Sequence, residues 1–506
     1  MVPITITLSS LLLLLLLLVS TTAFLLFIGK RRNDELPPGP RRLPLIGNLH
    51  QLGNLPHLSL QLLSNIYGPL MFLQLGSIPT LVISSADVAR EIFKGYDLVF
   101  SGRPLTFAAK RLSYSSSAIT FAPYGDYWKE IKKITIMELL SIKRVHSFRA
   151  VREEEVALMV ATISSSSSVP VNLSEMVFCL ANNVICRIAF GKKYEEGGSN
   201  GEVQFYRILK ETQELLGSFS ISDFFPWMEW INKVNGFQAK VEETFHKLDN
   251  FYDEIIDEHL DPSKPKPQEE DLVDVLLRIQ KDPNQGISLT RDQIKGVLTD
   301  MFIAGTDTAA ATVIWTMAEL IRHPTTMKRT QEEVRRAIGR KQVVEENELP
   351  RFNYLKMVVK EAPRLHPPAP LLVPRETMED CTIRSYKIPV KTRVFINAKS
   401  IATDKKYWDN PKDFQPERFL HKSIDFQELD FELLPFGAGR RGCPGIHFAV
   451  VLIELVLANL LHCFDWELPR GVEVSDLDMT EAVGLTMHKK SPLLLVATTA
   501  NISRNE

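Results

Sequence analysis

Apolar residues dominate the start of the chain. Residues 1–29 carry no charge and contain an unbroken run from Leu11 to Leu18. The apolar stretch is longer than the ~20 residues with which a helix crosses a bilayer. Lys30, Arg31 and Arg32 follow at once, so the positive-inside rule predicts a membrane anchor with the bulk of the chain in the cytosol. A cleaved signal peptide is the alternative, but no basic segment precedes the apolar run.

After the basic residues the chain changes from apolar to proline-rich. The segment LPPGPRRLPLIGN at 36–48 contains four prolines, which cannot extend a helix and favour a stiff, extended spacer. Residues 71–85 (MFLQLGSIPTLVISS) then show the short β-branched runs of a strand hairpin. Most of the remaining chain has helical periodicity. We therefore expect an anchor at 1–29, a basic stop and proline-rich hinge at 30–48, and one large domain at 49–506 that is mainly α with a smaller β region.

One long helix stands out in this domain. Thr290 and Gln293 have the spacing of a capping box, and Pro324 stops the pattern beyond Arg322. Its centre, MFIAGTDTAAATVIW, is apolar on nearly every face. We expect such a helix to run through the core.

Composition narrows the function classes. Of 506 residues, 45% are hydrophobic and 24% charged, which is the balance of a globular protein, and the net charge is −2. Nucleic-acid binding is disfavoured because it needs clustered positive charge. The five cysteines are too few, and odd in number, for a disulfide framework.

One of these cysteines has an unusual setting. Cys443 lies in LPFGAGRRGCPG, residues 434–445, just before an apolar helical run. Four glycines let the backbone approach a flat ligand closely, and Pro444 suits the first turn of the helix. Free N–H groups at a helix start stabilise a thiolate. Zinc would need further ligands nearby and a nucleophile would need a base, whereas haem iron takes a lone thiolate.

This segment resembles the signature of cytochromes P450, Phe-x-x-Gly-x-Arg-x-Cys-x-Gly, at every fixed position: Phe436, Gly439, Arg441, Cys443 and Gly445. The resemblance implies the cytochrome P450 fold and a haem b whose iron is bound by Cys443. It also implies that Phe436 packs near the sulfur and that Arg441 pairs with a haem propionate. With the proline-rich hinge and the AGTDT segment, the chain is most similar to the plant microsomal family-71 clan.

The sequence AGTDT lies half-way along the long helix. Gly305 costs about 1 kcal/mol inside a helix relative to alanine, and it opens room beside the helix. Thr308 can donate back to the Ala304 carbonyl. By resemblance this is the oxygen-binding groove, with Asp307 and Thr308 as the catalytic acid–alcohol pair that delivers protons.

Two further groups of charged residues are implied by the resemblance. Glu361 and Arg364 lie three apart on one helical face, and Arg418 in FQPERF resembles the third member of a structural Glu-Arg-Arg cluster. Pro363 inside that turn is unusual, because it removes a helical hydrogen bond and can kink the helix. The sequence does not determine what Pro363 does to the geometry of the Glu361–Arg364 pair.

The second group would bind haem propionates. Trp128 and Lys132 lie one helical turn apart in YGDYWKEIKK, and Arg375 lies in LLVPRE. Lys132 stands where the family usually has arginine, so the charge is kept but the bidentate fork is lost.

The resemblance implies a monooxygenase that inserts one oxygen atom of O2 into a small apolar metabolite of the terpenoid, phenylpropanoid or alkaloid class. NADPH electrons would arrive through a membrane-bound reductase on the Cys443 side, in the endoplasmic reticulum membrane. The alternatives are a reductase-independent haem-thiolate isomerase or dehydratase and a membrane-tethered haem sensor. The expected substrate-pocket residues, by position, are Phe121, Ala304, Ala369, Leu372, Val373 and Leu485.

Overall fold

The protein is mainly helical. The computed structural model describes residues 8–28, 35–166, 169–192, 202–263, 270–282, 288–422, 424–426, 430–482 and 484–500. The α-helices are α1 Leu8–Ile28, α2 Pro56–Tyr67, α3 Ala86–Gly95, α4 Phe107–Leu112, α5 Asp126–Ile134, α6 Ile142–Ser147, α7 Arg149–Ser165, α8 Leu173–Phe190, α9 Glu202–Gly217, α10 Ile231–Val234, α11 Phe237–Leu260, α12 Leu272–Lys281, α13 Arg291–Arg322, α14 Pro324–Ile338, α15 Asn353–Leu365, α16 Ala398–Ala402 and α17 Ile446–Cys463.

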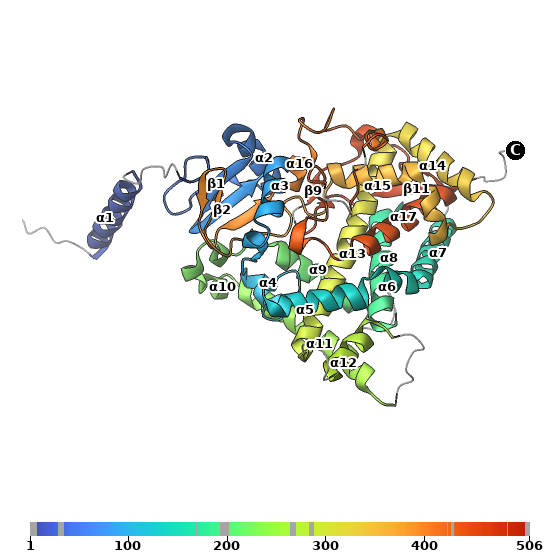
Figure 1. Cartoon of the computed structure of the whole chain (residues 1–506), viewed down its shortest axis with the longest axis horizontal. Helices are drawn as coiled ribbons and strands as arrows, with labels where there is room; N and C mark the ends of the chain where they lie inside the picture. Colours follow the sequence, from blue (N-terminus) through green and yellow to red (C-terminus); the bar gives the residue numbers. More distant parts are fainter. Residues whose placement is uncertain are drawn as a thin grey trace, which may run out of the picture.

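The strands form small sheets beside the helices (Figure 1). The largest has the order β1-β2-β7-β4, and β1 and β2 are the antiparallel hairpin that the sequence predicts. Strand β2 pairs in parallel with β7, which brings the chain near residue 80 beside the chain near residue 393. The strands are β1 Leu70–Leu75, β2 Ile78–Ile83, β3 Pro170–Asn172, β4 Arg375–Glu376, β5 Cys381–Ile383, β6 Tyr386–Ile388, β7 Arg393–Ile396, β8 Phe464–Glu467, β9 Glu481–Ala482, β10 His488–Lys489 and β11 Leu494–Thr499.

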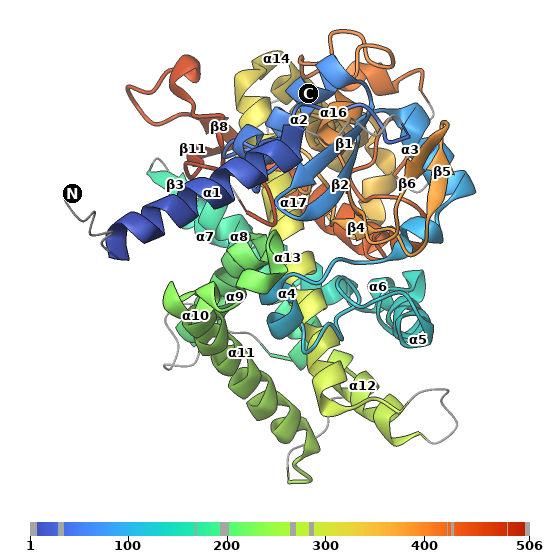
Figure 2. The same ribbon diagram turned by 90° about the vertical axis from the view of Figure 1, so that its left-hand side faces the viewer.

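Helix α13 is the central element. Thr290 caps its N-terminus with the predicted capping box to Gln293, and the helix ends before Pro324. Most of its side chains from Ile294 to Ile321 are buried, because neighbours cover it on several sides. Helices α8, α15 and α17 all pack against it, and Figure 2 labels α8 and α17 beside it. The expectation of a helix running through the core is confirmed.

The close contact between α13 and α8 explains one glycine. A Cβ on Gly305 would lie 2.8 Å from the Ile185 side chain of α8. The missing side chain therefore lets the two helices approach, in addition to leaving space beside α13. Both Gly305 and Ile185 line the same cavity.

The segment after the predicted anchor joins the folded body. The Phe72 amide of β1 donates to the Pro38 carbonyl at 2.9 Å, and Gly47 bridges to Leu75. A Cβ on Gly39 would lie 2.0 Å from the Phe72 carbonyl oxygen. This part of the proline-rich stretch therefore packs along β1 instead of standing free as a spacer.

Helix α1 contains the first apolar run. Its described side chains, 11–22, are exposed, with Leu11 to Val19 between 55% and 67% exposed. Among the described residues, α8, α13 and α17 are long and apolar enough to cross a membrane. Helices α8 and α17 pack against α13 in the core of the protein. Burial there explains why the side chains of all three helices are apolar.

Candidate functional site

The cysteine loop lies between two glycine-dependent turns and helix α17. Gly437 and Gly439 have φ of +68° and +66°, the left-handed region that favours glycine. A Cβ on Gly439 would lie 2.3 Å from the Asp97 carboxylate, so glycine is required there on two counts. The Cys443 amide donates to the Phe436 carbonyl at 3.0 Å and closes the loop.

The Cys443 thiol faces a cavity at the start of α17. The helix begins at Ile446 with Gly445 as its N-cap, so Pro444 precedes the N-cap instead of lying in the first helical turn. Burial raises the pKa of the Cys443 thiol, and the Gly445 N–H and the charge of Lys132 oppose that rise. Protein surrounds the Cys443 side chain, and its sulfur is accessible from within the cavity.

Helix α13 supplies another part of the cavity wall. Ala304, Gly305 and Thr308 line it together with Cys443. Thr308 Oγ1 donates to the Ala304 carbonyl at 2.7 Å, as the sequence predicts. A hydroxyl and an accessible thiol therefore share one mostly apolar space.

Positive charge gathers at the cavity. Among its described lining residues, Arg103, Lys132, Arg375 and Arg441 are cationic, and Asp300 is the acidic side chain. Trp128 lies between two of them: Arg441 Cζ is 4.3 Å and Lys132 Nζ 5.0 Å from the centre of its ring. Both distances suit cation–π attraction.

These cations mostly bond to backbone carbonyls. Arg441 donates to Ser101, Ile119 and Ala122, and Arg375 to Phe100 and Ala438. Lys132 donates to the Arg440 carbonyl.

Among the described lining residues, the four cations outnumber the one carboxylate, Asp300. Burial, and then the charge of Arg375, lowers the pKa of Arg441 to about 9. Burial lowers the pKa of Arg375 to about 10, although Asp97, 3.4 Å away, opposes this. Burial, Arg441 and Arg375 hold the pKa of Arg103 well below its usual value. A cluster of this kind is suited to a ligand with more than one carboxylate.

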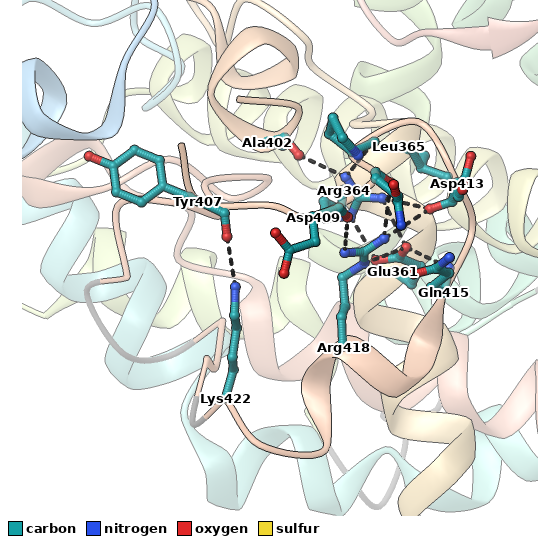
Figure 3. Close-up of polar contacts among 12 residues, drawn as sticks. Glu361, Arg364, Leu365, Ala402, Tyr407, Asp409, Asp413, Gln415, Arg418 and Lys422 are labelled. Atoms are coloured by element: carbon teal, nitrogen blue, oxygen red, sulfur yellow. Dashed lines mark hydrogen bonds and ion pairs between the residues drawn. The ribbon is translucent and has the colours of Figure 1, made fainter. Parts of the chain in front are cut away.

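A buried ionic cluster joins α15 to the segment at 402–418 (Figure 3). Arg364 donates to both Glu361 oxygens, at 2.7 and 2.9 Å, and Arg418 Nε donates to Oε1 at 3.0 Å. The remaining donors of both arginines reach backbone carbonyls of residues 402–413. Pro363 lies within α15, and the pair is still formed with its full bidentate geometry. Pro363 therefore leaves the Glu361–Arg364 pair intact.

Comparison with known proteins decides the family. The cytochrome P450 family model matches residues 37–496. The chain belongs to the cytochrome P450 family. It is 59% identical to cytochrome P450 71A9 of Glycine max, over 92% of this chain and 93% of the relative. It is 57% identical to strychnine-11-hydroxylase of Strychnos nux-vomica, over 91% of each chain.

A solved structure supports the same family. A zebra fish cytochrome P450, solved with abiraterone, superposes with a TM-score of 0.74 at 26% identity, over 88% of this chain and 100% of the other. The fold is therefore that of a cytochrome P450, and the chain is a P450 monooxygenase. Membership implies a haem iron cofactor.

The residues of this cytochrome P450 fit that cofactor. The Cys443 thiol offers the iron a ligand, the apolar walls suit the macrocycle, and the surplus of buried cations suits its two carboxylates. Phe436 lines the cavity beside the cysteine, and its ring meets Phe426 edge-on at 5.2 Å.

The other predicted residues divide into two sets. Ala304, Ala369, Leu372, Val373 and Trp128 line the cavity. Phe121 and Leu485 are partly buried against the hydrophobic core and are not among its lining residues. Asp307 also lies outside the lining, and its carboxylate Oδ1 is 2.7 Å from His488 Nε2.

The structure adds residues that the sequence reasoning missed. Arg103 donates to the carbonyls of Thr120, Val373 and Pro374 and lines the cavity. The sequence could have indicated Arg103, because it is the lone charged residue in the run VFSGRPLTFAA at 99–109. Asp300 is likewise the lone charge in an apolar stretch of α13. Burial raises the pKa of Asp300 to about 6.

Proposed function

We propose that this cytochrome P450 is a membrane-bound monooxygenase that inserts one oxygen atom of O2 into a small apolar plant specialised metabolite. The observation that carries the proposal is the single cavity shared by the Cys443 thiol, the buried cations and the α13 groove. When bound, the haem supplies the activation of dioxygen.

The residues of the chain would have distinct roles in that reaction. Cys443 would bind the iron, and Arg441, Arg375, Lys132 and Trp128 would hold the propionates. Phe436, Gly439 and Gly445 would shape the cysteine loop around the sulfur. Glu361, Arg364 and Arg418 would keep the surrounding loops in place without touching the cofactor.

Proton supply would fall to α13. Thr308 presents a hydroxyl to the cavity, and the buried Asp307 carboxyl neighbours it in the same helical turn. An acid and an alcohol in this arrangement suit general acid catalysis. The same pair favours a monooxygenase over the alternative, a reductase-independent haem-thiolate isomerase or dehydratase, which needs no proton delivery to oxygen.

The electrons would come from NADPH through a reductase docked on the cysteine-loop side. Lys129, Lys133 and Arg440 are exposed beside that loop and α5, with 51%, 63% and 51% of their side chains accessible. Each of them also lies within 4.0 Å of a carboxylate of its own chain, on Asp126, Glu130 and Asp97, so an acidic partner would compete with these pairs.

The chain would be anchored in the endoplasmic reticulum membrane, with residues 1–29 as the anchor. Residues 30–48 would be the basic stop and a proline-rich stretch that packs along β1 of the cytosolic catalytic domain at 49–506. Exposed apolar side chains support this membrane placement. Leu45 is 80% exposed, and Trp227 and Trp230 are 66% and 60% exposed. Their segments meet at the β1–β2 turn, because Gly76 donates to the Ile46 carbonyl and Ser77 to the Phe224 carbonyl. Aromatic and apolar side chains of this kind suit a membrane interface.

The substrate would be a terpenoid, phenylpropanoid or alkaloid held against Ala304, Ala369, Leu372 and Val373. A relative at 57% identity is named as a hydroxylase of strychnine, an alkaloid. Small residues at 304 and 369 leave room for a bulky, rigid molecule next to the groove.

The experiment has two stages. A carbon-monoxide difference spectrum of the reduced protein in membranes should show the red-shifted Soret band of thiolate ligation, which Cys443→Ser abolishes and Cys381→Ser on β5 retains. Membranes with reductase and NADPH are then screened for oxygenated products against compounds of the three classes. Product formed equally without NADPH and reductase would favour the isomerase or dehydratase. The red-shifted Soret band without consumption of NADPH would indicate a haem sensor.

A further inference from the structure

Thr135 places a buried hydroxyl without a partner in the wall of the cavity. The residue is 2% exposed, and it lines the same cavity as Cys443. Its Oγ1 is buried and makes no hydrogen bond. Among the described residues that line the cavity, Thr135 is the only one with a buried side-chain nitrogen or oxygen that lacks a partner. A buried hydroxyl that stays unpaired costs free energy, so this position calls for an acceptor inside the cavity.

The local backbone sets Thr135 apart from the threonines of α13. A threonine inside a helix can donate its hydroxyl to the carbonyl four residues earlier, and Thr308, Thr312 and Thr316 all do so. Thr135 instead begins a π-helical turn, Thr135–Leu139, directly after α5, and its hydroxyl makes no such bond. Turns of this kind often mark functional sites. The hydroxyl therefore remains available to a group in the cavity.

Thr135 shares a face of its helix with two residues that already border the cavity. Trp128, Lys132 and Thr135 are spaced four and three residues apart, which places them on one helical face, and all three line the cavity. Lys132 donates to the Arg440 carbonyl, and an ammonium has three donors in total. An anion that meets Lys132 in the cavity therefore lies close to the Thr135 hydroxyl as well.

Haem b brings acceptors of one kind to this space, which are its two carboxylates. A lysine offers a carboxylate a point charge, whereas an arginine offers two parallel N–H donors. Lys132 therefore leaves room for a second donor from the same helical face. We propose that the Thr135 hydroxyl donates to the haem carboxylate that Lys132 neutralises, and so supplies the hydrogen bond that an arginine fork would have given. This inference rests on the role of Lys132 in the proposed function.

The first test measures how tightly the loaded protein holds haem. Thr135→Val removes the hydroxyl and keeps the shape of the side chain. Transfer of haem from this variant to apomyoglobin should be roughly 10-fold faster than from the parent protein, as expected for the loss of a hydrogen bond to a charged group. Thr135→Ser keeps the hydroxyl and should transfer haem at the parent rate. Equal rates for Thr135→Val and the parent protein would overturn the inference.

Thr306 on α13 provides the matched control. It is also a buried threonine whose Oγ1 lacks a partner, but it does not line the cavity. Thr306→Val should therefore leave the rate of haem transfer unchanged. The same acceleration in Thr306→Val as in Thr135→Val would mean that the loss of any buried hydroxyl loosens the protein, and would overturn the inference.

The second test uses the sign of a stability change in the haem-loaded protein. Valine in place of an unpaired buried hydroxyl should raise the melting temperature, and we expect this for Thr306→Val. Thr135→Val should lower the melting temperature, because it deletes a hydrogen bond to the cofactor. A rise in both variants would show that the Thr135 hydroxyl stays unpaired when haem is bound, and would overturn the inference.

A double-mutant cycle tests the link to Lys132. In a Lys132→Arg background the guanidinium provides both donors, so Thr135→Val should accelerate haem transfer much less than it does in the parent protein. The same acceleration in both backgrounds would contradict the proposed division of the two hydrogen bonds between Lys132 and Thr135.

The outcomes separate this inference from the proposed function. Haem transfer needs neither substrate nor reductase, so a product screen that fails does not change these measurements. A parent-like transfer rate in Lys132→Leu would refute the role of Lys132 and the inference together. Fast transfer from Lys132→Leu beside a parent-like Thr135→Val would overturn the inference about Thr135 alone.

Discussion

Arg364 and Glu361 form a bidentate pair in which both side chains are fully buried, at 2.7 and 2.9 Å, although Pro363 lies between them in α15. The pair survives because it lies in the last turn, where the helix ends at Leu365 and the His366 amide already closes onto the Ala362 carbonyl. A proline there removes one hydrogen bond near the helix end and leaves the direction of both side chains unchanged.

The Glu361 carboxylate should be required for folding, because it neutralises two arginines. Glu361→Gln leaves two arginines without their counter-charge, which costs about 3–5 kcal/mol for a buried pair. We expect the variant to accumulate little haem-loaded protein. Pro363→Ala is the matched control, since it changes the same turn without touching the pair, and should keep the red-shifted carbon-monoxide band. Equal yields of the two variants would contradict this account.

Replacing Gly439 by alanine should distort the loop around Cys443. Gly439→Ala adds a Cβ 2.3 Å from the Asp97 carboxylate at a φ of +66°. Gly236→Ala provides the comparison, because Gly236 is in the left-handed region with a φ of +79° and nothing lies within 4 Å of the added carbon. The strain of a left-handed alanine is about 1–2 kcal/mol in both, so thermal unfolding should show a further loss in Gly439→Ala only. That variant should also lose the thiolate-type spectrum.

Arg103 should affect how tightly haem is held. Arg103→Leu removes one buried cation from the cavity and leaves the carbonyls of Thr120, Val373 and Pro374 without their donor. We expect transfer of haem to apomyoglobin to become roughly 10-fold faster, as for other groups that support a cofactor ligand. Arg393→Leu, another buried arginine that does not line the cavity, should lower the melting temperature without this change in transfer rate.

The stability of the protein should fall as pH rises through neutrality, in part because of Glu454 on α17. Burial raises the pKa of this carboxyl from 4.5 to about 7, although Lys356 and Lys360 oppose the rise. Between these values the folded state binds more protons than the unfolded state, so the free energy of unfolding decreases with increasing pH.

Glu454→Gln removes this dependence. Relative to the parent protein, the variant should gain on the order of 1 kcal/mol between about pH 6 and about pH 8. Melting temperatures of both proteins across that range provide the measurement. A constant difference between them would mean that Glu454 is already ionised at the lower pH.

The features that could be predicted from the amino-acid sequence are those with local signals. The β1–β2 hairpin, the capped helix α13 and the glycine-rich loop around Cys443 each arise from neighbouring residues, because turn chemistry, capping and periodicity act over a few positions. The Thr308 bond to Ala304 is local in the same sense, since it joins residues one helical turn apart.

Contacts between groups far apart in the chain could not be predicted in this way. Arg103 reaches Val373 across 270 residues of chain, and Asp307 turns toward His488 because α13 packs beside β10. Periodicity places a side chain on a helix but not its partner on another element. Packing of buried surfaces selects that partner, and a buried charge then requires one.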